Sequence, residues 1–580
     1  MKRLLLLTAL FCFVSVSYGF TVDKITYTTL DDNSVKVTGF SFSLVDVVIP
    51  SEVTYNNVTY QVKEMGYKGL YGYNSSASTK YSKMETLVIS EGIELLNELS
   101  IASNRNLKQV SLPSTLIEIG KKAFNNGTNI QSVIFPNGSN LLAIGEEAFN
   151  ECENLEIFEI PSSVLSIGKY AFFKNKKMES FVIPENVTVI EEYTFGECSS
   201  LNTVILHDNL THINERAFTD CVQLYNIDNN LPESLEFIGS RAFYGVPGFK
   251  HLVLRGNLKS IKSLSFANCN NLEYVWIQEG ITSIGQSAFS GCQNLKYIVL
   301  PSTLKTIEQS GFGGFDNKNH ISRSFIILTD EPFQTMSFTT TDYLGNSYPN
   351  TKTWSFGLIA TDDCFFVKES AVESYRTKWS YYVPNNNIDY QIPFNADLTY
   401  STNYREFDMD FHVAAESGNK PFVATSYNDQ SATFTSIDDF IVPAETGIVI
   451  RKLSDENTWY QIAEQQGSSS SMNNYLKGVT YSDIITPTTE DGNVNFVLNN
   501  GVFCRFNNAG MLGDHKAYLQ LPSQTAGSVL SFCFSDNSDG IIEIKNDNDK
   551  IDTIYNLNGI RVKHPKKGCL YIKNGKKIIY

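Results

Sequence analysis

The residues best suited to chemistry are five cysteines that recur at one place in a repeating pattern. Each falls three residues after a phenylalanine, and they are Cys152, Cys198, Cys221, Cys269 and Cys292. A column of thiols could hold a metal ion or undergo redox chemistry, but none of them has a second Cys or a His at ligand spacing. Other repeats place different residues there, namely Asn104, Gly127, Asn175 and Val246. This variety indicates a small, inward-facing position, so we interpret the cysteines as structural.

The oxidation state of these thiols stays open at this stage. Nine of the ten cysteines follow the N-terminal apolar segment, and an odd number cannot pair completely. Cys198 and Cys221 lie one repeat apart, as do Cys269 and Cys292, so distance alone does not exclude a disulfide within either pair.

Other titratable residues form no catalytic or metal-binding pattern. The sequence contains no H-E-x-x-H, C-x-x-C, G-x-x-x-x-G-K or G-x-S-x-G motif. His207 and His212 are predicted on a strand and the following turn, which favours a solvated pair over a metal site. An acidic cluster lacks the Gly and the closing Glu of a calcium loop, and comprises Asp547, Asp549 and Asp552. We therefore predict no enzyme activity, no cofactor and no metal site.

A repeat of nearly fixed length positions the cysteines. The anchor phenylalanines are Phe124, Phe149, Phe172, Phe195, Phe218, Phe243, Phe266, Phe289 and Phe312, and two of the intervals between them are slightly longer than the others. An apolar residue follows each of the first eight after six residues. A period in the twenties with paired apolar strand positions is typical of a leucine-rich-repeat solenoid. With a divergent coil that has Ile101 in the anchor place, we expect about ten coils.

The net charge and the N-terminal residues restrict where the protein is expected to be located and which partners it is expected to bind. The chain of 580 residues has a formal net charge of −16, and phosphate binding needs a basic face, so nucleic acid is not expected as the partner. Lys2-Arg3, an apolar run and Ser17-Tyr18-Gly19 predict a secretory signal peptide cleaved after Gly19. No later segment approaches the roughly 20 apolar residues of a membrane-spanning helix. We expect an exported protein, extracellular or on the outer cell surface, without a transmembrane segment.

The fold class predicted is mainly β, with a leucine-rich-repeat solenoid followed by an antiparallel β domain and a small C-terminal β segment. A final repeat strand is expected within 325–333, and a strand with a short closing helix within 364–380. The predicted boundaries are a signal peptide (1–19), an N-terminal β cap (20–55), the repeats (56–335), a closing segment of the solenoid (336–395), the antiparallel β domain (396–536) and a linker with the C-terminal segment (537–580).

The repeat blocks I-G-x-x-A-F-x-x-C-x-x-L and V-x-I-P resemble the BspA-like, or Treponema-type, leucine-rich repeats over about Val47 to Phe315. The final segment, through IYNLNGIRV and KGCLYIKNGKK, is similar to the C-terminal sorting domains of type IX secretion cargo. Family members are mostly surface or secreted proteins of host-associated bacteria, and some adhere to host matrix proteins or to other bacteria. The resemblance therefore implies a surface protein with adhesin-like binding.

A binding surface is predicted on the strand that precedes each turn. Strand residues alternate between faces, so the residue between V and I in L-x-x-V-x-I points away from the core, as does the residue two positions earlier. An exposed aromatic cluster on neighbouring strands is the usual composition of a protein-binding hot spot, although strands favour such residues anyway and other parts of the chain could cover them. The predicted binding residues, on the concave face, are His251, Val253, Tyr274, Trp276, Tyr297, Val299 and Ile205.

The sequence thus predicts a non-enzymatic, secreted or cell-surface binding protein that presents a concave repeat face to a protein partner. The partner would be host extracellular matrix or another bacterial surface. The alternative is a carbohydrate-binding or hydrolytic β domain carried on a repeat spacer, with Trp459 and Tyr460 as its most suggestive aromatic residues. A glycosidase pair would have to come from carboxylates that sequence cannot pair in space, such as Asp408, Asp410, Asp438 and Asp439.

Overall fold

The computed structural model describes residues 17–314, except 31–32, 76–80 and 228–230, and residues 321–393 with short gaps. Within 400–534 it describes the strands, one helix and some adjoining residues, and after these only 554–555, 570–573 and 576–579. Most of the predicted signal peptide therefore lies outside the described residues, as do Asp547, Asp549 and Asp552. The chain divides into two compact units, Met1–Tyr390 and Gln391–Tyr580.

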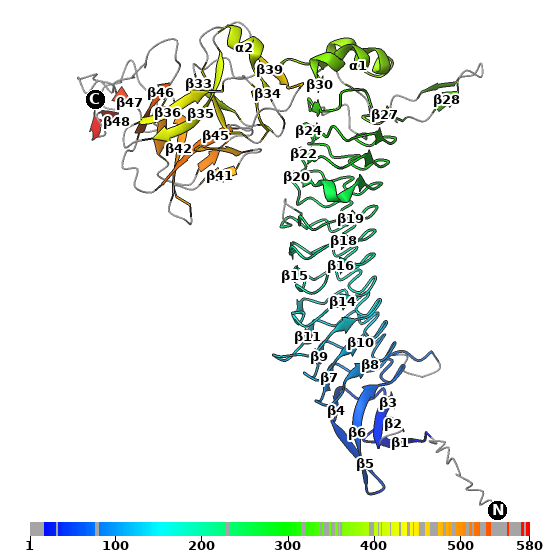
Figure 1. Ribbon diagram of the computed structural model, residues 1–580. Helices are drawn as coiled ribbons and strands as arrows, with labels where there is room; N and C mark the ends of the chain where they lie inside the picture. Colours follow the sequence, from blue (N-terminus) through cyan, green and yellow to red (C-terminus); the bar gives the residue numbers. More distant parts are fainter. Residues whose placement is uncertain are drawn as a thin grey trace, which may run out of the picture. The chain divides into compact units, whose positions relative to one another are not determined.

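The first unit is a β-solenoid in which most coils contribute one strand to each of two parallel sheets. Figure 1 shows the coils stacked one on another from β4 and β8 to β30. The front sheet contains β4 (Asp46–Ile49), β7 (Thr86–Ile89), β9 (Gln109–Ser111), β11 (Ser132–Ile134), β13 (Ile157–Phe158), β15 (Ser180–Val182), β17 (Thr203–Ile205), β20 (His251–Leu254), β22 (Tyr274–Ile277), β24 (Tyr297–Leu300), β26 (Ser324–Ile327), β30 (Cys364–Phe366) and β31 (Ile388–Asp389).

The back sheet is made of shorter strands from the opposite side of each coil. It contains β6 (Val58–Met65), β8 (Leu95–Leu96), β10 (Glu118–Ile119), β12 (Ala143–Ile144), β14 (Ser166–Ile167), β16 (Val189–Ile190), β18 (His212–Ile213), β19 (Phe237–Ile238), β21 (Ser260–Ile261), β23 (Ser283–Ile284), β25 (Thr306–Ile307) and β27 (Gln334–Thr335). Each sheet is interrupted along the stack, and the front sheet pairs in groups of β4–β13, β15–β17 and β20–β31.

The first coil is closed by strands from the N-terminal segment. β1 (Gly19–Val22), β2 (Ile25–Thr29) and β3 (Ser34–Phe40) form an antiparallel meander, and β3 pairs in parallel with β6. β5 (Glu52–Tyr55) pairs antiparallel with β6. These strands cover apolar residues that no preceding coil could cover, since a solenoid exposes its first core layer.

The anchor phenylalanines form one continuous stack through the core. Every one of the nine is at most 1% exposed. Successive rings from Phe124 to Phe312 lie nearly parallel, with centroids 4.9–5.7 Å apart. A single coil is too thin to bury such a ring, so each ring depends on its neighbours above and below.

A backbone ladder accompanies the stacked rings. The amide of each anchor donates to the carbonyl of the residue just before the next anchor, as Phe172 N–H does to Thr194 at 3.0 Å and Phe195 N–H to Ala217 at 2.9 Å. The repeat length thus fixes both ring stacking and hydrogen bonding. The two longer coils, which end at Phe149 and Phe243, keep the same bonds, from Phe124 N–H to Ala148 and from Phe218 N–H to Ala242, both at 2.8 Å.

The solenoid continues beyond the repeats found in the sequence. Phe356 stacks on Phe312 at 5.9 Å, and Phe312 N–H donates to Ser355 at 2.8 Å, so Phe356 is a further anchor. The prediction that the anchors end at Phe312 is therefore wrong, as is the expectation that the strand within 325–333 is the final one of the repeats. An insertion that contains β28 (Thr339–Thr341) and β29 (Ser347–Pro349) separates the two anchors and hides the period.

The C-terminal end of the solenoid is closed by a helix. β30 is followed by α1 (Val372–Trp379), which confirms the predicted strand and short helix. Short 3₁₀ helices lie at Gly256–Leu258, Glu369–Ala371 and Asn385–Asn387. Trp379 of α1 packs against Phe333, Trp354 and Phe365, so its indole covers the last core layer.

The second unit contains further β sheets, most of their pairs antiparallel. Its largest sheet has the order β33-β38-β35-β36-β46-β43-β42-β45-β40, with β36 and β46 parallel. The elements are β32 (Ile392–Pro393), β33 (Tyr400–Asn403), β34 (Met409–Asp410), α2 (His412–Glu416), β35 (Lys420–Tyr427), β36 (Ser431–Ser436), β37 (Ile441–Val442), β38 (Ile448–Arg451), β39 (Trp459–Ile462), β40 (Leu476–Val479), β41 (Asp483–Ile485), β42 (Val494–Asn499), β43 (Val502–Arg505), β44 (Gly510–Leu512), β45 (Lys516–Leu521) and β46 (Val529–Phe534).

The last residues form a small antiparallel sheet of β47 (Ile554–Tyr555), β48 (Leu570–Lys573) and β49 (Lys576–Ile579). The predicted mainly β fold, with a solenoid followed by antiparallel sheets, is confirmed. Among the described residues, no helix has the length and apolar character needed to cross a bilayer.

Two neighbouring phenylalanines allow a matched test of the stacked core. Phe172 is fully buried in the stack, whereas Phe173 is only partly buried at the edge of the coil. Phe172→Ala should lower the unfolding free energy by about 3–5 kcal/mol because it leaves a cavity, and Phe173→Ala by about 1–2 kcal/mol. Urea unfolding of the full chain measures both, and equal losses would show that the stack is not the main source of stability.

Candidate functional site

The outward positions of the front sheet carry an apolar row that is open to solvent. In register on adjoining strands, Val182 pairs with Ile205, and their side chains are 54% and 53% exposed. Other exposed members of the same row are Val48, Val88 and Ile134. Ser111 and Glu159 interrupt the row. Ile205 is thus the predicted binding residue that the structure places in the open.

The aromatic part of the predicted surface is less accessible than the alternation rule suggested. His251, Val253, Tyr274 and Val299 are buried, and Trp276 and Tyr297 are partly buried. The expectation that all of these side chains are exposed is therefore wrong. They do point away from the solenoid core, since the residues between them in sequence, such as Leu252, Val275 and Ile298, form the core instead.

Ring stacking accounts for part of this burial. The rings of Tyr274 and Tyr297 are nearly parallel with centroids 5.3 Å apart, and the His251 ring lies 6.5 Å from that of Tyr274. β20, β22 and β24 hold these residues on adjoining rungs, because His251 pairs with Tyr274 and Tyr274 with Tyr297. The structure therefore brings the predicted cluster together, with Trp276 and Tyr297 as its more accessible members.

The repeat cysteines are core residues that hydrogen-bond between coils. All five are fully buried, and each thiol donates to the carbonyl of the anchor phenylalanine in the preceding coil, as Cys221 Sγ does to Phe195 at 3.0 Å. Burial raises the pKa of the Cys152 and Cys198 thiols to about 12. Because the thiolate is the reactive form, burial disfavours reaction of these two thiols at neutral pH. The five are free thiols in the structure, which confirms their structural interpretation.

The titratable residues considered for metal binding have other partners. His207 Nδ1 accepts a hydrogen bond from the Asn209 amide at 3.2 Å, and His212 Nδ1 lies 2.9 Å from the Thr211 hydroxyl. Within the described part of the chain, no three His, Cys, Asp or Glu side chains are grouped so that they could hold a metal ion.

The β domain does not present the aromatic pair considered for carbohydrate binding. Tyr460 is fully buried, stacks on Phe411 at 5.1 Å and accepts a hydrogen bond from Arg405 Nε. Trp459 is partly buried. Asp410 accepts a bond from Gln461 at 3.3 Å, whereas Asp408, Asp438 and Asp439 lie outside the described residues.

One buried ion pair was not indicated by the sequence. The guanidinium of Arg323 lies against the carboxylate of Asp363, with Nη2 donating to Oδ2 at 2.6 Å and Nε to Oδ1 at 3.2 Å. The backbone amide of Arg323 also donates to Oδ1 at 2.9 Å. Both side chains are at most 1% exposed. Their wide separation along the chain gives no motif by which sequence could find them.

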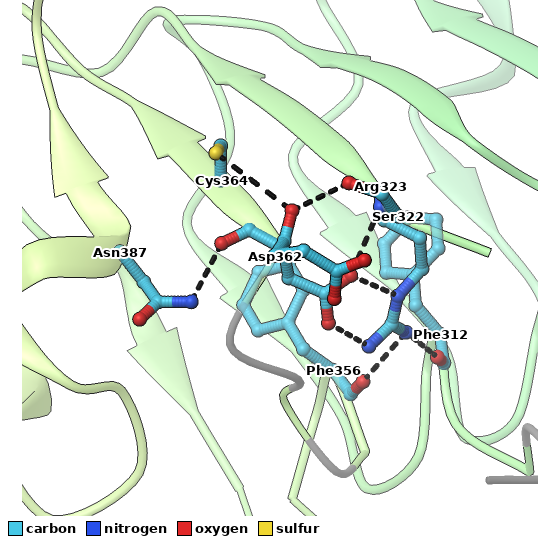
Figure 2. Close-up of polar contacts among 8 residues, drawn as sticks. Phe312, Ser322, Arg323, Phe356, Asp362, Cys364 and Asn387 are labelled. Atoms are coloured by element: carbon cyan, nitrogen blue, oxygen red, sulfur yellow. Dashed lines mark hydrogen bonds and ion pairs between the residues drawn. The ribbon is translucent and has the colours of Figure 1, made fainter. Parts of the chain in front are cut away.

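Arg323 supports the anchors where the coils carry an insertion. Its Nη1 donates to the carbonyls of Phe312 at 3.5 Å and Phe356 at 3.3 Å, the two anchors on either side of the insertion (Figure 2). In earlier coils a thiol such as that of Cys292 donates to an anchor carbonyl. Arg323 therefore does for the last two anchors what the cysteines do inside the stack, and Asp363 neutralises its charge.

The repeats match a known protein family. Residues 74–202 and 189–321 match the family model for the BspA type leucine rich repeat region, in six copies. Residues 74–321 are BspA-type leucine-rich repeats. The resemblance of the repeat blocks to that family is thereby confirmed, and the matched residues contain all the anchors from Phe124 to Phe312. A comparison with curated proteins finds no match.

Several solved structures are similar to this chain. A leucine-rich repeat protein from Bacteroides ovatus is 21% identical over 54% of this chain and 95% of its own, with a TM-score of 0.40. A leucine rich cell surface protein from Faecalibacterium prausnitzii is 21% identical over 54% and 89%, with a TM-score of 0.35. The pneumococcal vaccine antigen PcpA is 18% identical over 64% and 98%, with a TM-score of 0.36.

The buried ion pair makes a clear prediction for stability. Asp363→Ala leaves the Arg323 guanidinium buried without its counter-charge, so the unfolding free energy should fall by about 3–5 kcal/mol. The control is Glu153→Ala, which removes an exposed pair with Lys176 (2.8 Å) and should cost less than about 1 kcal/mol. Chemical unfolding of both variants measures the difference, and an Asp363→Ala protein as stable as the control would contradict the assigned role.

Proposed function

We propose that this protein is a non-enzymatic binding protein, exported to the cell surface or released, whose front sheet captures a protein partner. The observation that supports the proposal is the row of apolar side chains left open on the front sheet. Val182 and Ile205 are more than half exposed on paired strands, although the solenoid has a separate, fully packed core. Apolar groups arranged side by side on a rigid surface are favourable anchors for another protein.

The rigidity of the front sheet supports binding of this kind. Backbone pairing holds Val182 and Ile205 at a fixed spacing, and ion pairs join neighbouring coils, as between Lys177 and Glu156 at 3.4 Å. A partner that docks on a preformed surface does not have to order it, which reduces the entropic cost of association. Trp276 and Tyr297, still partly accessible, would extend the contact at the C-terminal coils.

The partner class follows from the resemblance of the repeats to surface proteins, and would be host extracellular matrix or another bacterial surface. A sorting role for residues 537–580 in type IX secretion belongs to the same proposal, and the C-terminal sequence of the exported protein would test it. The residues that could be cleaved lie mostly outside the described part of the chain.

Substitutions on the two sheets test the proposal. Val182→Ser with Ile205→Ser should weaken capture of the partner at least about tenfold, because two anchoring contacts are lost. The control is Ile117→Ser with Leu165→Ser, which changes two comparably exposed apolar residues next to strands of the back sheet. Binding would be measured with the full chain on purified matrix proteins and on whole bacterial cells.

Thermal melting should be almost unchanged in both double variants, since all four side chains are exposed. The proposal is wrong if the unsubstituted chain binds none of these surfaces, or if binding survives the front-sheet substitutions and is lost with those of the back sheet.

A further inference from the structure

A column of asparagines links successive coils at the turn before the front sheet. These residues lie five positions after the anchor place and donate from Nδ2 to a carbonyl in the preceding coil, as Asn154 does to Thr128 at 2.8 Å. The other members of this column are Asn106, Asn129, Asn271 and Asn294, with bonds of 2.6–3.0 Å. Each of these asparagines therefore gives one backbone carbonyl of the preceding coil a hydrogen-bond partner.

Gly248 leaves this column without a side chain in one coil. It occupies the place five residues after Phe243, where other coils have Asn, Lys, Ser or Gln. A Cβ atom at Gly248 would lie 2.5 Å from the Leu224 carbonyl oxygen and 2.8 Å from Ile227 Cγ2. The backbone thus approaches the preceding coil more closely than any side chain allows, and Gly248 itself contributes no side chain to the surface there.

A small open cavity lies at this place. Its volume is about 210 Å³, and it is lined by Tyr225, Pro247, Gly248, Lys250, Asn271, Glu273 and Asn294. The Tyr225 side chain is 48% exposed and provides an aromatic wall. All the lining residues belong to the solenoid unit, and they come from four successive coils held in register by the anchor ladder.

The polar groups of the cavity are held in place by neighbouring coils. Asn271 Nδ2 is fixed by its bond to the Pro247 carbonyl at 3.0 Å, and Asn294 Nδ2 by its bond to the Asn270 carbonyl at 2.7 Å. Glu273 lies between two ammonium groups, 3.8 Å from that of Lys250 and 2.7 Å from that of Lys296. Lys296 does not line the cavity, so the lining itself carries one ammonium group, of Lys250, and one carboxylate, of Glu273, besides the amides.

We propose that this cavity binds one neutral sugar ring of a glycan. The flat, half-exposed ring of Tyr225 suits the C–H face of a sugar, and the amides and Glu273 offer acceptors and donors for its hydroxyl groups. A phosphate or sulfate would meet the Glu273 carboxylate, and a purely apolar ligand would leave the polar lining without partners. The open shape fits a ring that belongs to a larger molecule.

This inference goes beyond the proposed protein binding, because it concerns other residues and another ligand class. The apolar row of the front sheet uses Val182 and Ile205, neither of which lines the cavity. The two sites can therefore fail or succeed independently in experiment.

The test compares Asn271 with Asn154, whose side chains make the same kind of hydrogen bond between coils. The full chain would be screened on an array of neutral glycans that includes N-acetylglucosamine, galactose and mannose, and affinities for the bound glycan measured by calorimetry. Tyr225→Ala and Asn271→Ala should each weaken binding at least about tenfold. Asn154→Ala removes an equivalent inter-coil bond in an earlier coil, outside the cavity, and should leave the affinity unchanged.

The proposal is overturned if the chain binds no neutral glycan, or if Tyr225→Ala and Asn271→Ala bind within twofold of the unsubstituted chain. An equal loss in Asn154→Ala would also overturn it, since the effect would then come from the solenoid as a whole. Thermal melting of all three variants accompanies the measurements. If Asn271→Ala fails to fold, two substitutions of the half-exposed Tyr225 decide whether the cavity binds the glycan. Tyr225→Phe should keep the binding and Tyr225→Ala should lose it.

Discussion

Stacking of the anchor phenylalanines between coils is the interaction on which the rest of the structure depends. A single coil cannot enclose an aromatic ring, so each ring is buried only when a second coil lies on each side of it. The amide ladder beside the rings sets the same spacing. The N-terminal strands and α1 are needed for the same reason, since they cover the core layers at the two ends of the stack.

This constraint separates the residues that hold the solenoid together from those available for binding. Positions that face the core accept Phe, Leu, Ile, Val or a buried Cys and are fixed by packing. Outward positions of the front sheet, such as Val182 and Ile205, carry no such requirement, yet the spacing of the coils holds them in rows. A departure from the repeat, as at Gly248, changes the surface locally while the stack beneath it stays intact.

The features that could be predicted from the sequence are those that follow from the constant length of the repeat. The anchors, the inward cysteines and the face on which each strand residue lies all follow from the regular repeat. Phe356 was missed because an insertion places it outside that period. Arg323 and Asp363 could not be paired, because a contact between residues so far apart in the chain leaves no spacing signal.

The burial of side chains on the outer faces of the sheets could not be predicted from the repeat. Alternation correctly turned Tyr274 and Val299 away from the core but could not reveal that they are nonetheless buried. The same limit applies to Tyr460, whose strand position gave no sign of its packing on Phe411. Tyr274 stacks on a residue of the neighbouring strand and Tyr460 on a residue of another segment, and the pattern of a single strand encodes neither contact.

Hydrogen exchange of the anchor amides in the native full chain tests the dependence on stacking most directly. The amides of Phe149, Phe195 and Phe243 all donate to the next coil and lie in the interior of the stack. They should exchange slowly and with similar protection, because opening any one of them requires neighbouring coils to separate. Exchange of these amides at the rate of exposed turn residues, with the fold otherwise retained, would contradict the account.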